Sequence, residues 1–469
     1  MFVELVDFII DFLPIMMFAS LAILLFTGYP VAFILGGLAL LFGFTGYLFD
    51  MFQIVEFFNF LPRIWGLAAE NLVLVAVPTF VVMGVMMERS GVANDMLYCC
   101  QVLLKRVPGG LAIAVAIMGT ILAAMTGIIG ASVTMMTALA LPTMLRQGYS
   151  HALATGVICA SGTLGILIPP SIMLIIMADL LSVSVGDVFL AALMPGLALA
   201  AIYVVYIATA SSIKPSIAPP LSPELLNVPR SEMPALLLKS FFPPVFLIAL
   251  IKGSILLGWA TPSEAGAVGA FGATLLAAFA GRLKRDMVVG VCHSAGLTVS
   301  FIFFIIICAT CFAYVFRSLG GDDVIEGLIL EAGLDAWGLL FLIMGIVFVL
   351  GFFLDWVEIT LIILPVFAPI VVGLDFTAHM PPYAEYIGAQ KVMTIWFTVL
   401  VAINLQTSFL TPPFGYALFY LKGIAPREVN LMSIYRGIIP FVICQLIALI
   451  MVVAFPHIAL WLPFSGGAG

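Results

Sequence analysis

The sequence predicts an all-α polytopic membrane protein built from two inverted repeats, each with a helical hairpin and a helix broken by a double proline. The chain of 469 residues is 64% hydrophobic and only 9% charged, and its mean hydropathy of +1.27 lies far outside the range of soluble domains. Apolar segments long enough to cross a bilayer recur along the chain. Two of them contain Pro-Pro, and the motifs around these pairs recur in both halves.

The apolar segments form two series of candidate membrane spans. In each series, two spans are followed by a short amphipathic arm (53–62 or 285–293), a span, a hairpin, a broken span and a last span. Each half therefore crosses the bilayer five times, and an odd number of crossings inverts the second copy. The candidate spans are 12–28, 31–49, 68–88, 111–127 with 132–146, 152–180, 188–210, 240–258, 264–281, 295–316, 336–353 with 356–373, 391–422 and 434–461.

Basic residues orient these spans, because cytoplasmic loops are enriched in Lys and Arg. No Lys or Arg precedes Arg63, so the N-terminus is expected outside, and the parity of the spans then places the C-terminus outside as well. An acidic stretch at 322–335 also falls outside. The loops assigned to the inside carry Arg89, Lys105, Arg106, Arg146, Lys214, Arg230, Lys239, Arg282, Lys284, Arg285, Lys422, Arg427 and Arg436.

Residues 111–146 and 336–373 each leave and return to the same side of the membrane. The charge pattern fits either two full spans or a re-entrant hairpin at each place. The turn of the first segment, residues 126–132, consists of small and aliphatic residues without proline. It lacks the charged or aromatic rim of a loop at the membrane surface. We therefore favour hairpins that end inside the protein.

The double prolines, Pro169-Pro170 and Pro412-Pro413, interrupt the broken spans at about 152–180 and 391–422. A proline has no N–H and its ring clashes with the carbonyl four residues earlier, so each pair frees two carbonyls. In hydrocarbon a freed carbonyl needs another partner, so such a break is tolerated only where it lines a protein-enclosed or watery cavity. Broken helices in matching halves of a chain indicate the binding site of a transporter.

Matching motifs define the two repeats. Ile168-PPS matches Thr411-PPF, Gly28-YPVAFILG matches Trp259-ATPSEAGAVG, and Met87-ERSG matches Phe316-RSLG. The first repeat is expected at 1–210, with its hairpin at about 111–146, and the second at 240–469, with its hairpin at about 336–373. The Pro/Ser-rich stretch 211–239 between them is expected to be a cytoplasmic linker.

Six motifs spread over nearly the whole chain resemble one known family. They are Gly28-YPVAF, Ala123-AMTGIIGAS, Arg146-QGYSHALATGVICASGTLGILIPPS, Trp259-ATPSEAGAV, Gly351-FFLD and Thr411-PPFG. Together they are similar to the large membrane subunit of tripartite ATP-independent periplasmic (TRAP) transporters. The chain departs from the family pattern after Asp355, where it has Trp356-Val357-Glu358, and before the second Pro-Pro, where it has Leu405-Gln406-Thr407-Ser408.

The resemblance implies a sodium-driven importer of organic acids in the bacterial inner membrane, with periplasmic termini. It implies an elevator-like transport domain built from the two hairpins and the two broken helices. It also implies two partners, which are a small four-helix membrane subunit and a periplasmic substrate-binding protein. The N-terminal part of this chain shows no additional four-helix block, so the small subunit is expected to be a separate polypeptide. Membrane lipid is the remaining partner, and no cofactor or nucleic acid is expected.

Sodium prefers hard oxygen ligands, which a helix break supplies as backbone carbonyls beside Ser or Thr hydroxyls. The sequence offers two such sets, one for each hairpin and its break, and no other metal is expected. For a single Ser or Thr in a membrane helix, a bond to its own backbone is the commoner role, and clustering at the breaks favours ligands. The first set is Gly130, Ala131, Ser132, Ser161, Gly162, Thr163, Gly165 and Ile166, and the second is Gly351, Asp355, Thr360, Thr407, Ser408 and Thr411.

An anionic substrate is expected where the N-termini of the hairpin and broken helices point, because their unpaired N–H groups carry partial positive charge. The expected substrate contacts are Ser132, Thr163, Asp355, Asn404 and Gln406. For the two amides, a hydrogen bond between helices is an equally good explanation. Glu358, the second carboxylate in this region, fits either a functional role or an outer aqueous vestibule.

Other classes of membrane protein fit the sequence less well. An enzyme is not expected, since HExxH, GxSxG and paired Cys and His ligands are missing from the sequence. An ATP-driven permease would need a separate ATPase, and a proton-pumping respiratory subunit would carry Lys and Glu at mid-membrane. An ion channel, or a secondary transporter with another coupling ion, is the alternative, because broken helices also build selectivity filters.

Overall fold

The computed structural model describes residues 2–127, 129–220, 229, 231–382, 384–412 and 415–465. All regular elements among these residues are helices, which confirms the predicted all-α class. Seven helical stretches in this part of the chain are long and apolar enough to span a bilayer. They are α2 (Val31–Leu48), α7 (Ile129–Arg146), α10 (Val185–Ile213), Met233–Leu256 with α11 and α12, α14 (Arg285–Ser318), α19 (Ala389–Leu410) and α21 (Leu431–Ala454).

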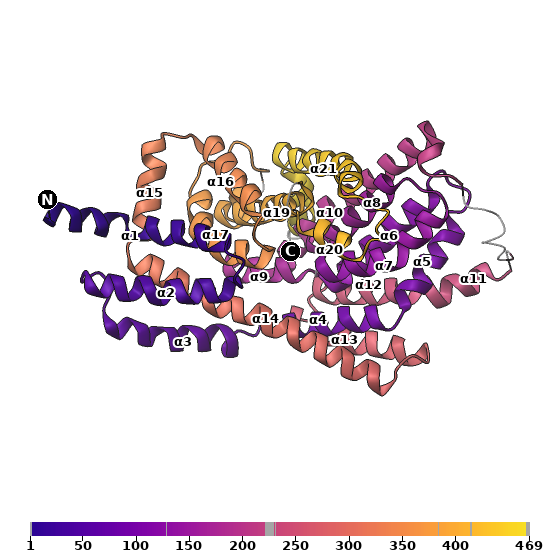
Figure 1. Ribbon diagram of the computed structural model, residues 1–469, viewed down its shortest axis with the longest axis horizontal. Coiled ribbons are helices and arrows are strands. Elements are labelled where there is room, and N and C mark those ends of the chain that lie inside the picture. Colours follow the sequence, from indigo (N-terminus) through magenta and orange to yellow (C-terminus); the bar gives the residue numbers. More distant parts are fainter. Residues whose placement is uncertain are drawn as a thin grey trace.

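The helices form two layers. In Figure 1, α2, α3 (Phe60–Trp65), α14 and α13 (Pro262–Phe279) line the lower edge of the elongated molecule, and we call this group the first layer. It also includes α4 (Ala76–Arg89) and α12 (Phe242–Leu256), which both pack on α13. The hairpins, the broken helices, α10 and α21 lie above it and form the second layer.

Small residues hold the helices of the first layer close together, as is common in membranes. A Cβ at Gly266 of α13 would overlap the Thr79 hydroxyl of α4. One turn later, a Cβ at Gly269 would come within 2.6 Å of the Met83 sulfur. The backbones of α4 and α13 therefore touch along two successive turns.

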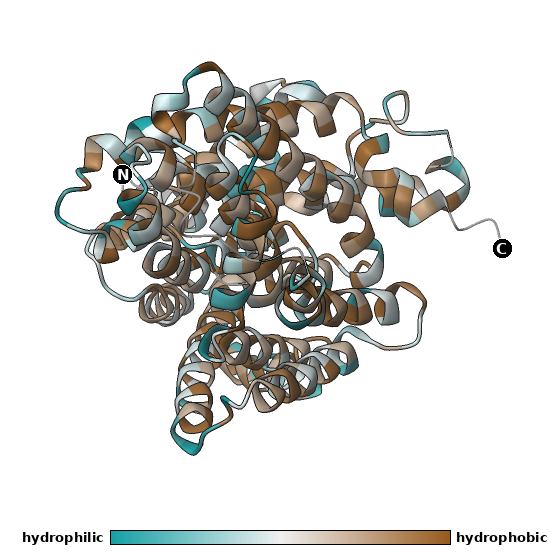
Figure 2. Ribbon diagram, turned by 90° about the vertical axis from the view of Figure 1, so that its right-hand side faces the viewer, coloured by the Kyte–Doolittle hydropathy of each residue, from teal (hydrophilic) through white to brown (hydrophobic). Residues whose placement is uncertain are grey.

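Large apolar side chains cover the outside of the first layer. Phe33 on α2 is 65% exposed, and Phe271 and Phe279 on α13 are 66% and 85% exposed. Figure 2 shows that brown, hydrophobic residues run along the helices, whereas teal, hydrophilic residues gather mainly at turns. Such a surface would be unstable in water, and it matches a polytopic chain surrounded by lipid.

Two short helices were not predicted from the sequence. They are α5 (Val92–Leu103) and α15 (Gly321–Ala332), and each has 12 residues. Both follow a glycine in the left-handed region, Gly91 with φ 69° and Gly320 with φ 82°. These glycines end the paired motifs at Met87-ERSG and Phe316-RSLG, so the two helices are counterparts in the two repeats. They are too short and too polar to be recognised as spans.

The two predicted arms differ in the structure. Residues 54–65 form a separate 3-10 and α-helical arm, η1 (Ile54–Asn59) followed by α3. The second arm, 285–293, is instead the first part of α14, a single helix of 34 residues. Because its sequence contains no proline or capping break between the arm and the span, the helix continues through both.

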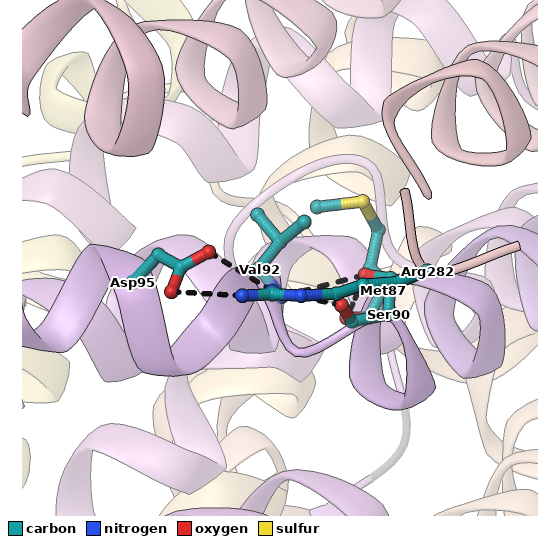
Figure 3. Close-up of polar contacts among 5 residues, drawn as sticks. All are labelled: Met87, Ser90, Val92, Asp95 and Arg282. Atoms are coloured by element: carbon teal, nitrogen blue, oxygen red, sulfur yellow. Dashed lines mark hydrogen bonds and ion pairs between the residues drawn. The ribbon is translucent and has the colours of Figure 1, made fainter. Parts of the chain in front are cut away.

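An arginine joins α5 to the end of α13. The Arg282 guanidinium forms an ion pair with Asp95 (2.9 Å to Oδ2) and also donates to Asp95 Oδ1 at 3.1 Å, so both carboxylate oxygens are used. It also donates to the Ser90 carbonyl at 3.0 Å (Figure 3). This bidentate contact fixes the turn between α4 and α5 against the first layer.

Candidate transport site at two helix breaks

The first broken helix consists of α8 (His151–Thr163), a 3-10 turn (Leu164–Ile166) and α9 (Ile172–Leu180). Pro169 and Pro170 lie in the gap before α9. The Ser171 hydroxyl donates to the Ile166 carbonyl at 2.8 Å. One of the two carbonyls expected to be free is therefore already bonded by a neighbouring side chain, and the sequence analysis had not assigned Ser171 a role.

The first hairpin, α6 (Gly110–Thr126) and α7, packs its tip on this break. A Cβ at Gly165 would overlap the Ala123 carbonyl of α6, and one at Gly162 would meet Val133 Cγ2 of α7 at 2.6 Å. At the turn, Gly127 has φ 61° and lies against Ile172. The hairpin therefore ends inside the protein, where Ser132 is only 1% exposed.

The second break follows the same plan. Helix α19 ends before Thr411 and Pro412, and α20 (Tyr416–Ile424) resumes after the break. Pro413, predicted to contribute to this break, lies outside the described residues. A Cβ at Gly351, just after α16 (Ala336–Leu350), would overlap the Ser408 hydroxyl of α19. The second hairpin, α16 with α17 (Trp356–Val372), thus packs its tip on the break of its own repeat.

Helix α20 brings the two hairpin tips together. The Tyr416 hydroxyl donates to the Phe353 carbonyl of the second hairpin at 2.8 Å. A Cβ at Gly130 of the first hairpin would lie 2.8 Å from the Tyr420 ring. Neither tyrosine was predicted as a site residue, although their position shortly after the second Pro-Pro places them at a break.

Five hydroxyls near the breaks share one arrangement: each donates to a carbonyl three or four residues earlier in the chain. This is the backbone bond that is common in membrane helices. A hydroxyl has two acceptor lone pairs besides its donor, so donation to the backbone leaves its oxygen able to bind a cation. The bonds are Ser161 to Val157 (2.5 Å), Thr163 to Ala160 (2.9 Å), Thr407 to Ile403 (2.9 Å), Ser408 to Leu405 (2.8 Å) and Thr411 to Thr407 (2.7 Å).

The carboxylates of the second hairpin cap the N-terminus of α17. Asp355 Oδ1 accepts from the Trp356 N–H at 2.8 Å, and Glu358 Oε2 accepts from the Asp355 N–H at 3.0 Å. The second of these is the bond that the residue at position N3 makes in a capping box, and the spacing Asp-x-x-Glu could have indicated it in the sequence. The nearby Thr360 hydroxyl is fully buried and has no hydrogen bond with any described residue. Such an orphaned oxygen fits a cation site at this hairpin.

The two amides of α19 point to different neighbours. Asn404 Nδ2 donates to the Met344 carbonyl of α16 at 2.7 Å, which is the bond between helices considered above. Gln406 is two positions further along, on roughly the opposite face of a helix with about 100° per residue. It is fully buried near Tyr203 and Gln445, and its amide makes no hydrogen bond with the described residues. The structure therefore separates Gln406 from the residues that face the second hairpin.

Comparison with known families decides the class of this protein. The family model described as "Tripartite ATP-independent periplasmic transporter, DctM component" matches residues 18–458. The chain belongs to this family. The resemblance found in the sequence motifs is therefore confirmed, and the chain is a large permease of the TRAP type.

Individual relatives agree with this family. The chain is 30% identical over 400 residues to the C4-dicarboxylate TRAP transporter large permease protein DctM of Pseudomonas aeruginosa, covering 84% of this chain and 87% of that protein. It is 25% identical to the isethionate TRAP transporter permease protein DctMQ of Oleidesulfovibrio alaskensis, covering 97% of this chain and 67% of that protein. Both relatives are transporter permeases rather than enzymes.

A solved structure supports the fold. The crystal structure of the Alcanivorax borkumensis YdaH transporter matches with a TM-score of 0.57, covering 88% of this chain and 89% of that chain. The two sequences are only 14% identical. At this level the likeness concerns the fold alone.

Proposed function

We propose that this chain is the permease subunit of a sodium-coupled importer of small organic acids. The observation that carries the proposal is the meeting of two hairpin tips and two helix breaks around α20. Gly351 touches Ser408 within the second repeat, and Gly130 of the first repeat touches Tyr420. Interrupted helices from two repeats, gathered at one buried place, are the usual setting of a secondary-transport site.

Sodium would be held by hydroxyl and carbonyl oxygens at each hairpin and its break. At the first break, Ser132 and the backbone around Gly130 lie beside the end of α8, and Gly162 and Gly165 allow the close approach. At the second, the orphaned Thr360 hydroxyl and the lone pairs of Ser408 and Thr411 supply candidate oxygens. Two separate sets support coupling to more than one sodium ion.

The substrate class follows from the relatives and from charge. The relatives are named for C4-dicarboxylate and isethionate, which are both small organic anions. We propose an organic acid delivered by a periplasmic substrate-binding protein. Asp355 lies at the second hairpin tip, so a bound cation there would offset its charge before an anion approaches.

The proposed partners include a small membrane subunit. This chain matches only 67% of the isethionate relative DctMQ, which leaves a third of that protein for an additional segment. The site would work in the bacterial inner membrane, with both termini in the periplasm. Transport would move the hairpins and broken helices of the second layer past the first layer, as in an elevator.

Reconstitution into proteoliposomes tests this function. Uptake of a radiolabelled organic acid is measured with the chain, its small subunit and its substrate-binding protein under an inward sodium gradient. We expect saturable uptake that stops when any component is omitted or when potassium replaces sodium. Uptake driven equally by a proton gradient would indicate another coupling ion, and non-saturable flux through the chain alone would indicate a channel.

A further inference from the structure

A cavity of about 710 Å³ lies between the two layers. On the first-layer side, the cavity is lined by α3 and by the C-terminal part of α14. On the other side, it is lined by the end of α9, by α17 and by α19. Its volume falls within the range of small-molecule sites. The polar side chains that line it include Arg63, Ser182, Thr310, Tyr314, Arg317 and Thr394.

The lining is positively charged. Among the described residues, the lining contains two guanidinium groups, Arg63 and Arg317, and no Asp or Glu. Asp322 forms an ion pair with Arg317 at 3.5 Å, and both side chains are about half exposed, so the pair contributes little free energy and opens readily to solvent. Arg63 has no ion pair with the described residues. The tip of the second hairpin, by contrast, carries the carboxylates Asp355 and Glu358.

Each arginine has a neutral contact that positions it. The Arg63 guanidinium lies 4.2 Å above the Tyr314 ring, whose hydroxyl accepts from Asn59 at 2.8 Å and donates to Glu56 at 3.1 Å. Glu56 is bonded to Tyr314 and to the Gln53 N–H. The arm therefore presents Arg63 to the cavity without a direct ion pair to a described residue.

Arg317 is positioned by the Pro365 carbonyl, which has no helical N–H donor. Pro369 has no N–H, so the Pro365 carbonyl four residues earlier in α17 loses its helical partner. Arg317 Nη2 donates to that carbonyl at 2.9 Å. A guanidinium has five N–H donors, so most of its donors stay available to an anion. Helix α17 belongs to the second hairpin, which makes this contact a direct bond between the two layers.

We propose that this cavity is an anion vestibule that binds the carboxylate of the organic acid through Arg63 and Arg317. The inference rests on the proposed function, because it takes its ligand class from that proposal. Arginine suits the role, since its planar fork matches a carboxylate and keeps its charge at every physiological pH. The vestibule is distinct from the hairpin tips, where cation-binding oxygens gather.

Charged thiol reagents measure the electrostatic potential of the cavity, and the measurement does not require the natural substrate. Ala313 lines the cavity on α14 and is replaced by cysteine in a chain whose exposed Cys292 is changed to serine. The purified protein reacts with an anionic sulfonatoethyl or a cationic trimethylammonioethyl methanethiosulfonate. We expect Arg63→Gln to lower the ratio of anionic to cationic rates about five-fold or more, with a similar effect of Arg317→Gln.

Matched variants separate charge from structure. Arg63→Lys keeps the charge and should keep the ratio. Arg146→Gln removes an arginine that also donates to a proline carbonyl, Pro142 at 3.2 Å, but does not line this cavity, so the ratio should not change. In a separate chain that keeps both Cys292 and Ala313, Cys292 in the N-terminal part of α14 should react with a ratio that Arg63→Gln does not change. An equal ratio in Arg63→Gln and in the parent would overturn the proposal.

Protection of the introduced cysteine from the thiol reagent tests whether a defined probe, succinate, binds in the cavity. Succinate should slow the modification of Ala313→Cys, whereas the neutral diamide succinamide should not, and Arg63→Gln with Arg317→Gln should abolish the protection. Protection by both compounds, or by neither, would contradict carboxylate binding. The labelling experiments do not depend on transport. If they confirm the vestibule but the chain shows no sodium-driven uptake, the proposed function alone is refuted. If uptake occurs and neither arginine variant changes it, the vestibule alone is refuted.

Discussion

Gly351→Ala is expected to abolish uptake while the protein still inserts into the membrane. The new Cβ would overlap the Ser408 hydroxyl and lie 2.5 Å from Ser408 Cβ. Ser408 is fully buried in α19, so it cannot move away without shifting the helix. Overpacking of this kind costs about 1 to 3 kcal/mol, and here it separates the second hairpin from the second break. Initial rates of uptake in proteoliposomes, at equal amounts of inserted protein, measure the effect.

Two variants make this prediction specific. Gly345→Ala, on α16, adds the same methyl group where no atom lies within 4 Å, and it should leave uptake near that of the parent. Ser408→Gly in the Gly351→Ala chain removes the overlapping atoms and should recover part of the activity. Normal uptake by Gly351→Ala would show that the contact between this hairpin and its break is not required.

Gly437→Ala should cause the largest loss of stability. A Cβ there would overlap the Ala152 carbonyl of α8, and a Cβ at Gly156 of α8 would likewise overlap the Gly437 carbonyl of α21. Alanine gains about 1 kcal/mol over glycine in a helix. Overlap with a backbone atom costs about 3 kcal/mol, because neither helix can relax by rotating a side chain. The net effect is destabilising, and thermal unfolding in detergent should occur several degrees lower.

Gly253→Ala is the matched control, because that glycine of α12 has no atom within 4 Å of the added methyl group. Only the helix-propensity gain remains there, so its unfolding temperature should equal or exceed that of the parent. If Gly437→Ala unfolded at the same temperature as Gly253→Ala, the close crossing of α8 and α21 would be refuted.

Much of the fold was predictable because membrane spans are set by local composition. Apolar length and the two Pro-Pro pairs located both breaks and the central part of most spans. The bounds were less accurate: α1 (Phe2–Leu25) begins well before the predicted 12–28, and α4 begins at Ala76 and not at 68. The helices α5 and α15 were missed because 12-residue amphipathic helices lack the apolar length of a span. The continuation of the second arm into α14 was missed because amphipathic character does not reveal whether two helices are joined.

The type of site was predictable from the sequence, but the contacts that its side chains make were not. Pro-Pro and the surrounding hydroxyls indicated where helices break, since that follows from backbone chemistry alone. The partner of each side chain depends on helix rotation and packing, which the sequence does not state. For this reason Asn404 and Gln406 appeared equivalent, although one bonds to Met344 and the other lies near Tyr203 and Gln445. The roles of Ser171 and Tyr420 likewise come from packing across the breaks.

The dependence of uptake on sodium concentration tests the central claim, that oxygens at the two breaks bind the coupling ion. Ser132→Ala and Thr411→Ala each remove one hydroxyl, and a lost bond to a charged group costs about 1 to 3 kcal/mol. Thr209→Ala is the control, because that exposed hydroxyl makes the same bond to its own helix, Val205 O at 2.8 Å, far from the breaks in sequence.

Uptake is measured against sodium at saturating substrate and substrate-binding protein. The account predicts that Ser132→Ala and Thr411→Ala raise the sodium concentration for half-maximal uptake about five-fold or more, since about 1 kcal/mol of lost ion binding corresponds to that factor. Thr209→Ala should match the parent. Curves for Ser132→Ala and Thr411→Ala that overlay the parent curve would contradict the account.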